Sequence, residues 1–328
     1  MIRPSIAELS FRVAYPVLVR ATLLRGVFGE PPLRMITRLR CYRLWALRCG
    51  ARPHKIERIR VGNLPPGDGG GAQIQGALAA FVFASLKGLE YVHIPLKTVM
   101  HSPQGEINWV TKWNQALRFP KIRTSQSEPI SLDSKRLLLL SMLKSTPSTV
   151  LCSREFRKLA DSSGRSYELV REQIRSLYPP AQHQKAKRSR TGLRVAVHVR
   201  RGDVSERGPE SWRYTASGQV IASVGKILQL VNNPVVTIFS NGTLDELEAF
   251  IEAGWRVDID SDALQTLEKL VTADVLVMSK SSFSYVAGVL STGKVFYEDF
   301  WHPPLPSWVN VNSLASSAVC GSTNREDS

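Results

Sequence analysis

Two hydrophobic periods alternate along the second half of the chain, one typical of strands and one typical of helices. Short apolar runs of the strand kind occupy residues 193–199, 234–239, 255–259 and 273–278. Helical spacing of apolar residues follows at 220–230, 243–253, 263–270 and 285–290. Thr243 and Glu246 have the spacing of a capping box for the helix that begins there. This alternation predicts a parallel sheet with helices on its faces, which is a Rossmann-like domain.

The first half carries a weaker pattern of the same kind. A strand is predicted over 58–62, then a glycine-rich turn, then a helix over 72–86 that is rich in Ala and Leu, and a second strand over 90–95. Further helical segments are predicted at 109–114, 137–143 and 167–177. The expected fold class is therefore α/β throughout the chain.

Length and composition divide the chain further. At 328 residues two domains are expected. The polar, basic run 182–190 has no apolar face and fits an interdomain linker. The predicted organisation is a basic helical segment (1–57), an amino-terminal Rossmann-like domain on the acceptor side (58–181), a linker (182–191), a carboxy-terminal nucleotide-sugar-binding domain (192–315) and a polar tail (316–328).

Charge and cysteine content restrict the partners and the compartment. Residues 1–60 hold 13 of the 43 Lys and Arg and three of the 28 Asp and Glu, so they carry most of the net charge of +15. A basic amphipathic segment of this kind either contacts an anionic membrane surface or packs on the first domain with a solvated charged side. Four scattered cysteines, without a secretory signal or an 18-residue apolar run, favour a cytoplasmic location, with peripheral contact at a membrane surface as the further expectation. Nucleic acid is disfavoured, because no aromatic residues interleave the basic run 182–190.

The strand at 193–199 ends in an unusual group of polar residues. His198, Arg200 and Arg201 come at its end, and Gly202 and Asp203 turn the chain outward. Ligands of open α/β sheets bind beyond the carboxyl ends of strands. One guanidinium group can bind two phosphate oxygens at once. The alternative is that both arginines are solvated or paired with surface carboxylates.

Two further segments have the composition of anion-binding turns. Glycines 69–71 stand before the helix 72–86, where backbone N–H groups can meet a phosphate, although such loops also serve as plain connections. The serine-rich run 279–284 joins the strand 273–278 to a helix, where the serines either bind an anion or only cap the helix. No Gly-x-x-x-x-Gly-Lys and no dinucleotide fingerprint is present, so nucleotide hydrolases and dehydrogenases are excluded.

Together these three blocks resemble the motifs of the GDP-fucose-dependent fucosyltransferase superfamily, which includes α1,2-, α1,6- and protein-O-fucosyltransferases. His198–Asp203 is similar to its His-x-Arg-Arg motif, and Gly69–Gln73 to its Gly-x-Gly-x-Gln loop. Ala273 and Asp274, followed by Ser281–Ser284, are similar to the segment of its sugar-donor domain. The resemblance implies a GT-B-like fold, with two Rossmann-like domains that face each other across a cleft.

The resemblance also implies roles for individual residues. Arg200 is the expected catalytic arginine, which stabilises the diphosphate leaving group. Asp203 is either the general base or a brace for the arginine turn, and Glu206 is a weaker alternative base. Thr266 stands where the family often has an acidic residue, so Asp260 and Asp262 are candidates for the guanine contact. The remaining residues expected to contact the sugar donor are His198, Arg201, Gly69, Gly71, Gln73, Ser281, Ser282 and Phe283.

The activity implied is that of an inverting glycosyltransferase that moves L-fucose from GDP-fucose, or another sugar from its GDP-sugar, to a hydroxyl of a glycan or glycoconjugate. No cofactor and no metal ion are expected, because arginines can neutralise the diphosphate. The alternative is a non-catalytic basic protein of the same fold that binds an anionic surface or nucleic acid.

Overall fold

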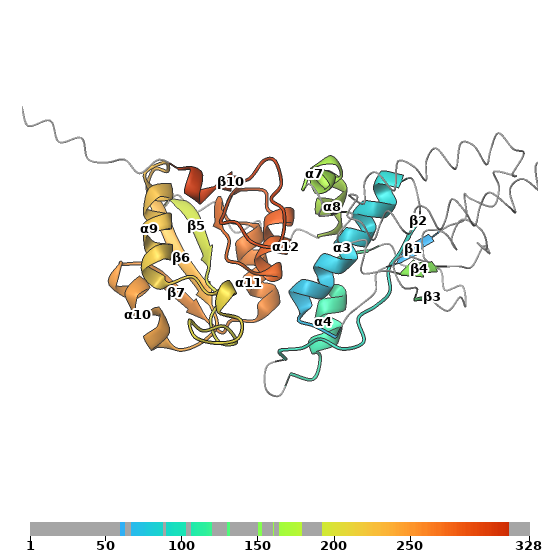
Figure 1. Cartoon of the computed structure of the whole chain (residues 1–328), viewed down its shortest axis with the longest axis horizontal. Coiled ribbons are helices and arrows are strands. Elements are labelled where there is room, and N and C mark those ends of the chain that lie inside the picture. Colours follow the sequence, from blue (N-terminus) through green and yellow to red (C-terminus); the bar gives the residue numbers. More distant parts are fainter. Residues whose placement is uncertain are drawn as a thin grey trace, which may run out of the picture. The chain divides into compact units, whose positions relative to one another are not determined.

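The computed structural model describes residues 60–62, 67–87, 90–102, 106–119, 130–131, 150–152, 160, 164–178 and 192–314 (Figure 1). The predicted basic segment 1–57, the helix at 137–143, the linker 182–191 and the tail 316–328 lie outside these residues. Two compact units are present. The larger holds the described residues within Gly67–Gln75, Leu96–Arg118 and Ser163–Ser328, and the smaller holds the other described residues. The domain boundaries expected from the sequence stay a prediction.

A six-stranded, fully parallel sheet forms the centre of the larger unit, in the order β10-β9-β8-β5-β6-β7. Its strands are β5 (Leu193–His198), β6 (Pro234–Ser240), β7 (Arg256–Ile259), β8 (Val275–Val277), β9 (Lys294–Tyr297) and β10 (Val309–Asn310). Strand β5 lies between β8 and β6, and its valines are buried in the core. Strands buried on both faces have such apolar runs.

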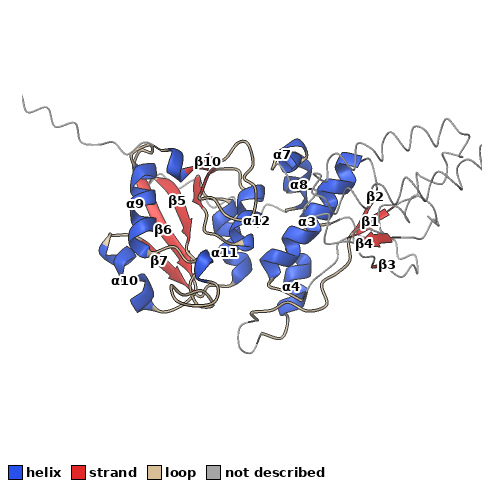
Figure 2. Cartoon of the chain, in the orientation of Figure 1, coloured by secondary structure: helices blue, strands red, loops and turns tan. Residues whose placement is uncertain are grey.

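Helices cover both faces of this sheet (Figure 2). On one face lie α9 (Ser217–Leu228) and α10 (Leu244–Glu252), and on the other α11 (Ala263–Val271) and α12 (Ser282–Leu290). The capping box predicted for α10 is confirmed, since Thr243 Oγ1 accepts the Glu246 N–H and a Glu246 carboxylate oxygen accepts the Thr243 N–H. The predicted Rossmann-like pattern of strands and helices is thus present in the larger unit.

The smaller unit contains a four-stranded parallel sheet in the order β2-β1-β4-β3. Its strands are β1 (Arg60–Gly62), β2 (Glu90–Val92), β3 (Ile130–Ser131) and β4 (Val150–Cys152). Helix α3 (Gly70–Lys87) begins in the larger unit and continues into the smaller one. His93 stacks on Phe119 with ring centroids 4.3 Å apart, so this histidine belongs to an aromatic cluster.

Shorter helices complete the larger unit: α4 (Trp109–Gln115), α7 (Arg165–Leu169), α8 (Arg171–Leu177), η3 (Ser211–Arg213) and η4 (Val311–Ser313). One continuous helix over 167–177 was the expectation, but two helices form. Val170 leaves helical geometry at φ −121° and ψ 19°, with its side chain buried and that of Leu169 exposed.

The predicted α/β class is confirmed, with a parallel sheet in each unit as in GT-B-like proteins. The expectation that two domains face each other across a cleft stays a prediction. Within the described part of the chain, no helix combines the length and hydrophobicity needed to cross a bilayer.

Candidate active site

The site lies where β5 and β8 end. These strands are adjacent and parallel, with Val197 opposite Val277, so the residues that follow both strands emerge at one edge of the sheet. His198 Nδ1 lies 2.7 Å from Ser279 Oγ, and Arg200 donates a hydrogen bond from Nη1 to Ser281 Oγ at 3.2 Å. The two segments singled out in the sequence, 198–203 and 279–284, are therefore brought together.

His198 is a buried, neutral imidazole. Burial first, and the nearby Arg200 charge second, lower the pKa of His198 to about 3. Its ring lies 5.3 Å from that of Phe283. A ring that stays neutral keeps hydrogen-bonding the Ser279 hydroxyl throughout the physiological pH range.

This burial should make the fold sensitive to acid. An unfolded histidine titrates near pH 6.5, so between about pH 6.5 and 3 the unfolded chain binds a proton that the folded chain does not, and stability must fall as pH falls. The amide of asparagine can replace Nδ1 in His198→Asn. We expect the free energy of unfolding of this variant to fall less between about pH 6.5 and 3 than that of wild type. Urea unfolding at pH 7, 5.5 and 4.5 measures the difference between wild type and variant. Identical pH slopes would contradict it. Acidic groups and His93, whose pKa burial lowers to about 4, contribute equally to both proteins.

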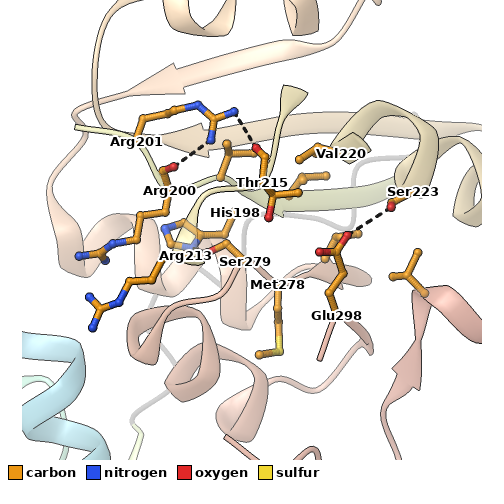
Figure 3. Close-up of a pocket in the computed structure, with 14 residues that line it drawn as sticks. His198, Arg200, Arg201, Arg213, Thr215, Val220, Ser223, Met278, Ser279 and Glu298 are labelled. Atoms are coloured by element: carbon orange, nitrogen blue, oxygen red, sulfur yellow. Dashed lines mark hydrogen bonds between the residues drawn. The ribbon is translucent and has the colours of Figure 1, made fainter. Parts of the chain in front are cut away.

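Arg200 has a partly exposed guanidinium that is fixed on two sides. Nη2 donates to Asp203 Oδ2 at 2.5 Å, and Nη1 holds the serine that caps α12. Nε is buried and has no hydrogen-bond partner among the described residues, whereas Nη1 and Nη2 each have a second N–H beyond the bond described here. Figure 3 shows the guanidiniums of Arg200 and Arg213 pointing in one direction and that of Arg201 in another. Arg200 is thus held in place while retaining unused N–H groups for an anion.

The Arg201 guanidinium forms its hydrogen bonds inside the protein. Its side chain is buried and donates to the carbonyl oxygens of Arg200 and Thr215 and to Ser217 Oγ, at 2.9–3.1 Å. The guanidinium also lies over the Tyr214 ring, 4.3 Å from its centroid. Burial lowers the pKa of Arg201 from its usual value. These contacts fix the 213–217 segment, so Arg201 shapes the site rather than presenting its fork at the surface.

The serines at the start of α12 divide into different roles. Ser281 caps the helix, since its Oγ accepts the Phe283 N–H at 3.3 Å. Ser284 is buried and its Oγ accepts the Ser279 N–H. Ser282 is half-buried, and its Oγ lies 3.1 Å from His302 Nε2. The capping alternative is therefore right for Ser281 and does not describe Ser282.

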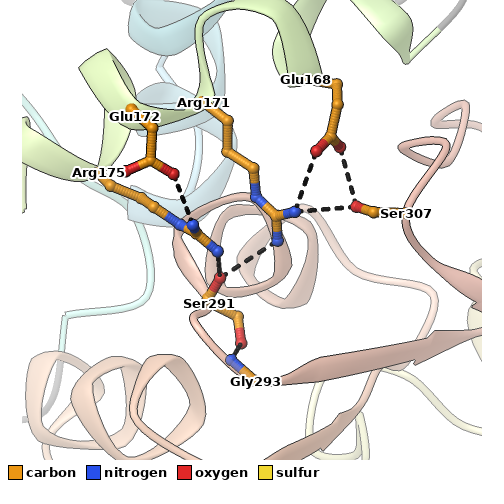
Figure 4. A network of polar contacts seen from close by, with 7 residues as sticks. All are labelled: Glu168, Arg171, Glu172, Arg175, Ser291, Gly293 and Ser307. Carbon is orange, nitrogen blue, oxygen red and sulfur yellow. Dashed lines mark hydrogen bonds and ion pairs between the residues drawn. The ribbon is translucent and has the colours of Figure 1, made fainter.

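The far end of α12 is also fixed. Arg171 and Arg175 of α8 both donate to the carbonyl oxygen of Ser291, just after the last turn of α12 (Figure 4). Cations at a helix C-terminus are favourable because they neutralise its negative dipole end. Glu168 and Glu172 pair with these arginines. This network holds the axis of the helix whose first turn lies at the site.

The glycine-rich turn reaches the same helix start. A Cβ on Gly71 would lie 2.7 Å from Phe283 Cα, so only glycine fits this approach of two backbones. Gln73 is buried, and its amide nitrogen donates to the carbonyl oxygens of Asp68 and Thr98. Gly69 N–H is bound by the Asp68 carboxylate at 2.7 Å. Gly71 therefore adjoins the serine segment, while Gln73 holds the loop.

Asp203, Asp260 and Asp262, the aspartate candidates, all have protein partners. Asp203 pairs with Arg200, while Asp262 caps α11 and pairs with Lys112 at 3.1 Å. Asp258, Asp260 and Asp262 also have Asp-x-Asp spacing, which attracts divalent cations in some transferases, but Asp258 pairs with Lys269 and Asp260 accepts from Asn241. Within the described ranges, no three His, Cys, Asp or Glu side chains are grouped to bind a metal. Glu206 is exposed.

Several residues of the site were not singled out from the sequence. A pocket at the sheet edge is lined by His198, Arg200 and Arg201 together with Arg213, Ser223 and Glu298 (Figure 3). Glu298 accepts from Ser223 at 3.4 Å and lies 4.0 Å from Lys280 Nζ. These residues follow no local pattern, because β5, α9 and β9 bring them together only in the folded unit.

Part of the chain is similar to a known protein family, and solved structures of low identity also match it. Residues 147–298 match glycosyl transferase family 11. NodZ α-1,6-fucosyltransferase co-crystallised with GDP is 15% identical, over 74% of this chain and 95% of that one, with a TM-score of 0.36. The same enzyme soaked with GDP-fucose is 15% identical over 75% and 97%, with a TM-score of 0.37. Fucosyltransferase NodZ from Bradyrhizobium is 15% identical over 72% and 94%, with a TM-score of 0.35. No curated protein matches the chain. The residues that match this family contain β5, β8 and the start of α12, which carry the candidate site.

Proposed function

We propose that this protein transfers L-fucose from GDP-fucose to a hydroxyl of a glycan or glycoconjugate, with inversion at the anomeric carbon. The observation that carries the proposal is the placement of Arg200, a braced and partly exposed guanidinium beside the first turn of α12. Two sources of positive potential, the guanidinium and the helix N-terminus, converge there. The family match over the same residues and the three sequence motifs support a GDP-sugar as the anion.

In the proposed reaction the acceptor oxygen attacks the anomeric carbon while the bond from that carbon to the β-phosphate oxygen breaks. The electron pair leaves with GDP, and the acceptor proton passes to a base. Charge grows on the β-phosphate during this step, so Arg200 stabilises the transition state more than the ground state. Its ion pair supports Asp203 as the residue that positions Arg200.

The proposed contacts to the sugar donor fall into two groups. Arg200, Ser282, Phe283 and the turn at Gly69 and Gly71 meet the diphosphate directly, with His198 close to the guanosine. Arg201, Gln73 and Ser281 act through the segments that they hold. Asp262 is the candidate for the guanine contact, in exchange for its present partner Lys112. No metal is part of this proposal, since guanidinium and helix dipole supply the positive charge.

A donor panel tests the proposal. Binding of GDP, UDP and guanosine, and hydrolysis of GDP-fucose, GDP-mannose and UDP-sugars, are measured by calorimetry and by nucleotide release. We expect GDP to bind more tightly than UDP and guanosine, and GDP-fucose to be hydrolysed fastest. A folded protein that ignores GDP, or that prefers UDP-sugars, would refute the assignment. The binding-protein alternative instead predicts steeply salt-dependent nucleic-acid or vesicle binding without any effect of nucleotide.

A further inference from the structure

A chain of hydrogen bonds behind the site links three distant segments. Gln75 Nε2 lies 3.0 Å from His302 Nδ1, and His302 Nε2 lies 3.1 Å from Ser282 Oγ. Gln75 belongs to α3, Ser282 to the first turn of α12, and His302 to the segment after β9. The side chains of Gln75 and His302 are buried, with 0% and 2% exposure, whereas Ser282 is half-buried. The chain thus runs from the interior to the edge of the site.

The order of atoms fixes the direction of these hydrogen bonds. An amide nitrogen can only donate, so Nδ1 of His302, which faces it, accepts. The imidazole is then protonated at Nε2 and donates to Ser282 Oγ. A serine oxygen that accepts this bond keeps its own O–H for another partner.

Aromatic rings hold the imidazole in this position. The His302 ring lies 4.6 Å from that of Tyr285 and 5.3 Å from those of Phe300 and Trp301. Tyr285 itself is anchored by its hydroxyl, which donates to the Pro303 carbonyl oxygen at 3.2 Å. Such packing restricts rotation of the ring. Nδ1 of His302 therefore stays directed at Gln75 while Nε2 stays directed at Ser282 Oγ.

We propose that His302 is a positioning residue that orients the Ser282 hydroxyl so that its proton faces the diphosphate of the sugar donor. This inference rests on the proposed function. With the opposite tautomer, Ser282 would donate its proton to His302 and present only lone pairs to an anionic ligand, which is repulsive. Gln75 excludes that tautomer, and Arg200 reaches the neighbouring Ser281, so both serines at the helix start are oriented by buried or braced partners.

A double-mutant cycle on the full chain tests the proposal. Ser282→Ala should weaken GDP binding about tenfold, because the lost hydrogen bond goes to a charged group. His302→Phe, which fits among the aromatic rings, should weaken it about fivefold in wild type and hardly at all in the Ser282→Ala background. His302→Gln, whose amide nitrogen can occupy the place of Nε2, should restore most of the affinity. Guanosine, which lacks phosphate, should bind equally to all five proteins.

Each outcome discriminates. Equal losses of GDP and guanosine affinity in His302→Phe, or the same loss in both backgrounds, would overturn the role of His302. If wild type itself does not distinguish GDP from guanosine, the proposed function fails instead. ¹⁵N spectra of wild type, which need no variant, should show an unprotonated Nδ1 and a protonated Nε2 for His302. The reverse pattern would refute the mechanism.

Discussion

Replacing Arg200 with alanine is expected to lower the rate of GDP-fucose cleavage by about 10²–10³-fold, the size of effect seen when one preorganised contact to a developing charge is removed. The guanidinium faces the site, while its contacts to Asp203 and Ser281 fix its direction before the substrate arrives. Alanine removes the charge without leaving a buried carboxylate, because the Asp203 side chain is exposed enough to be solvated. The loss should therefore appear in kcat rather than in stability.

Two variants make this experiment specific. Arg200→Lys keeps the charge but lacks the planar fork whose two terminal nitrogens reach Ser281 and Asp203 separately, so an intermediate rate is expected. Arg194→Ala is the matched control, because Arg194 is the second residue of β5, at the end opposite the site, and pairs there with Asp274. Exposed ion pairs contribute little to stability, so this variant should retain wild-type kcat. Single-turnover nucleotide release measures all three. A rate for Arg200→Ala within threefold of wild type would remove Arg200 from the mechanism.

Sequence pattern predicted β5 to β8 and α9 to α12 because each of these segments has a clear hydrophobic period, but it did not predict β9 or β10, which are four and two residues long. The valines of β5 and the Thr243–Glu246 box each specify their local structure without help from distant residues. The break at Val170 was missed, since nothing in the run 167–177 is a helix breaker. The burial of the Val170 side chain determines the non-helical backbone conformation there. Burial is a property of the folded unit and not of the local sequence.

The sequence indicated many of the residues of the site, but not which of them are exposed at the site and which are buried and hold it in place. Arg200 and Arg201 are adjacent and identical in chemistry, yet Arg200 is partly exposed beside α12 and Arg201 is buried against Tyr214. Successive side chains of an extended segment point to opposite sides, so two neighbours cannot both face one ligand. His302 had no signal at all, because its partners lie 20 and 227 residues away in the chain.

Gly71→Ala should disrupt the site by steric overlap with Phe283. Its Cβ would lie 2.7 Å from Phe283 Cα and 2.8 Å from Phe283 N, and neither atom can move without shifting the first turn of α12. Overpacking of this kind costs about 1–3 kcal/mol, and the shift would also displace Ser282. We therefore expect a lower melting temperature and weaker GDP binding.

Gly76→Ala is the control that separates the steric effect of the added Cβ from the preference of a helix for alanine over glycine. Gly76 lies in the same helix, and a Cβ there would meet no atom within 4 Å. Alanine is favoured over glycine inside a helix by about 0.5–1 kcal/mol, so this variant should melt at a higher temperature and bind GDP normally. Thermal unfolding with and without GDP gives both quantities. The two substitutions are the same chemical change in one helix, so shifts of opposite sign would support the contact between Gly71 and Phe283 as their cause. Shifts of the same sign would mean that the glycine-rich turn does not adjoin the start of α12 in solution.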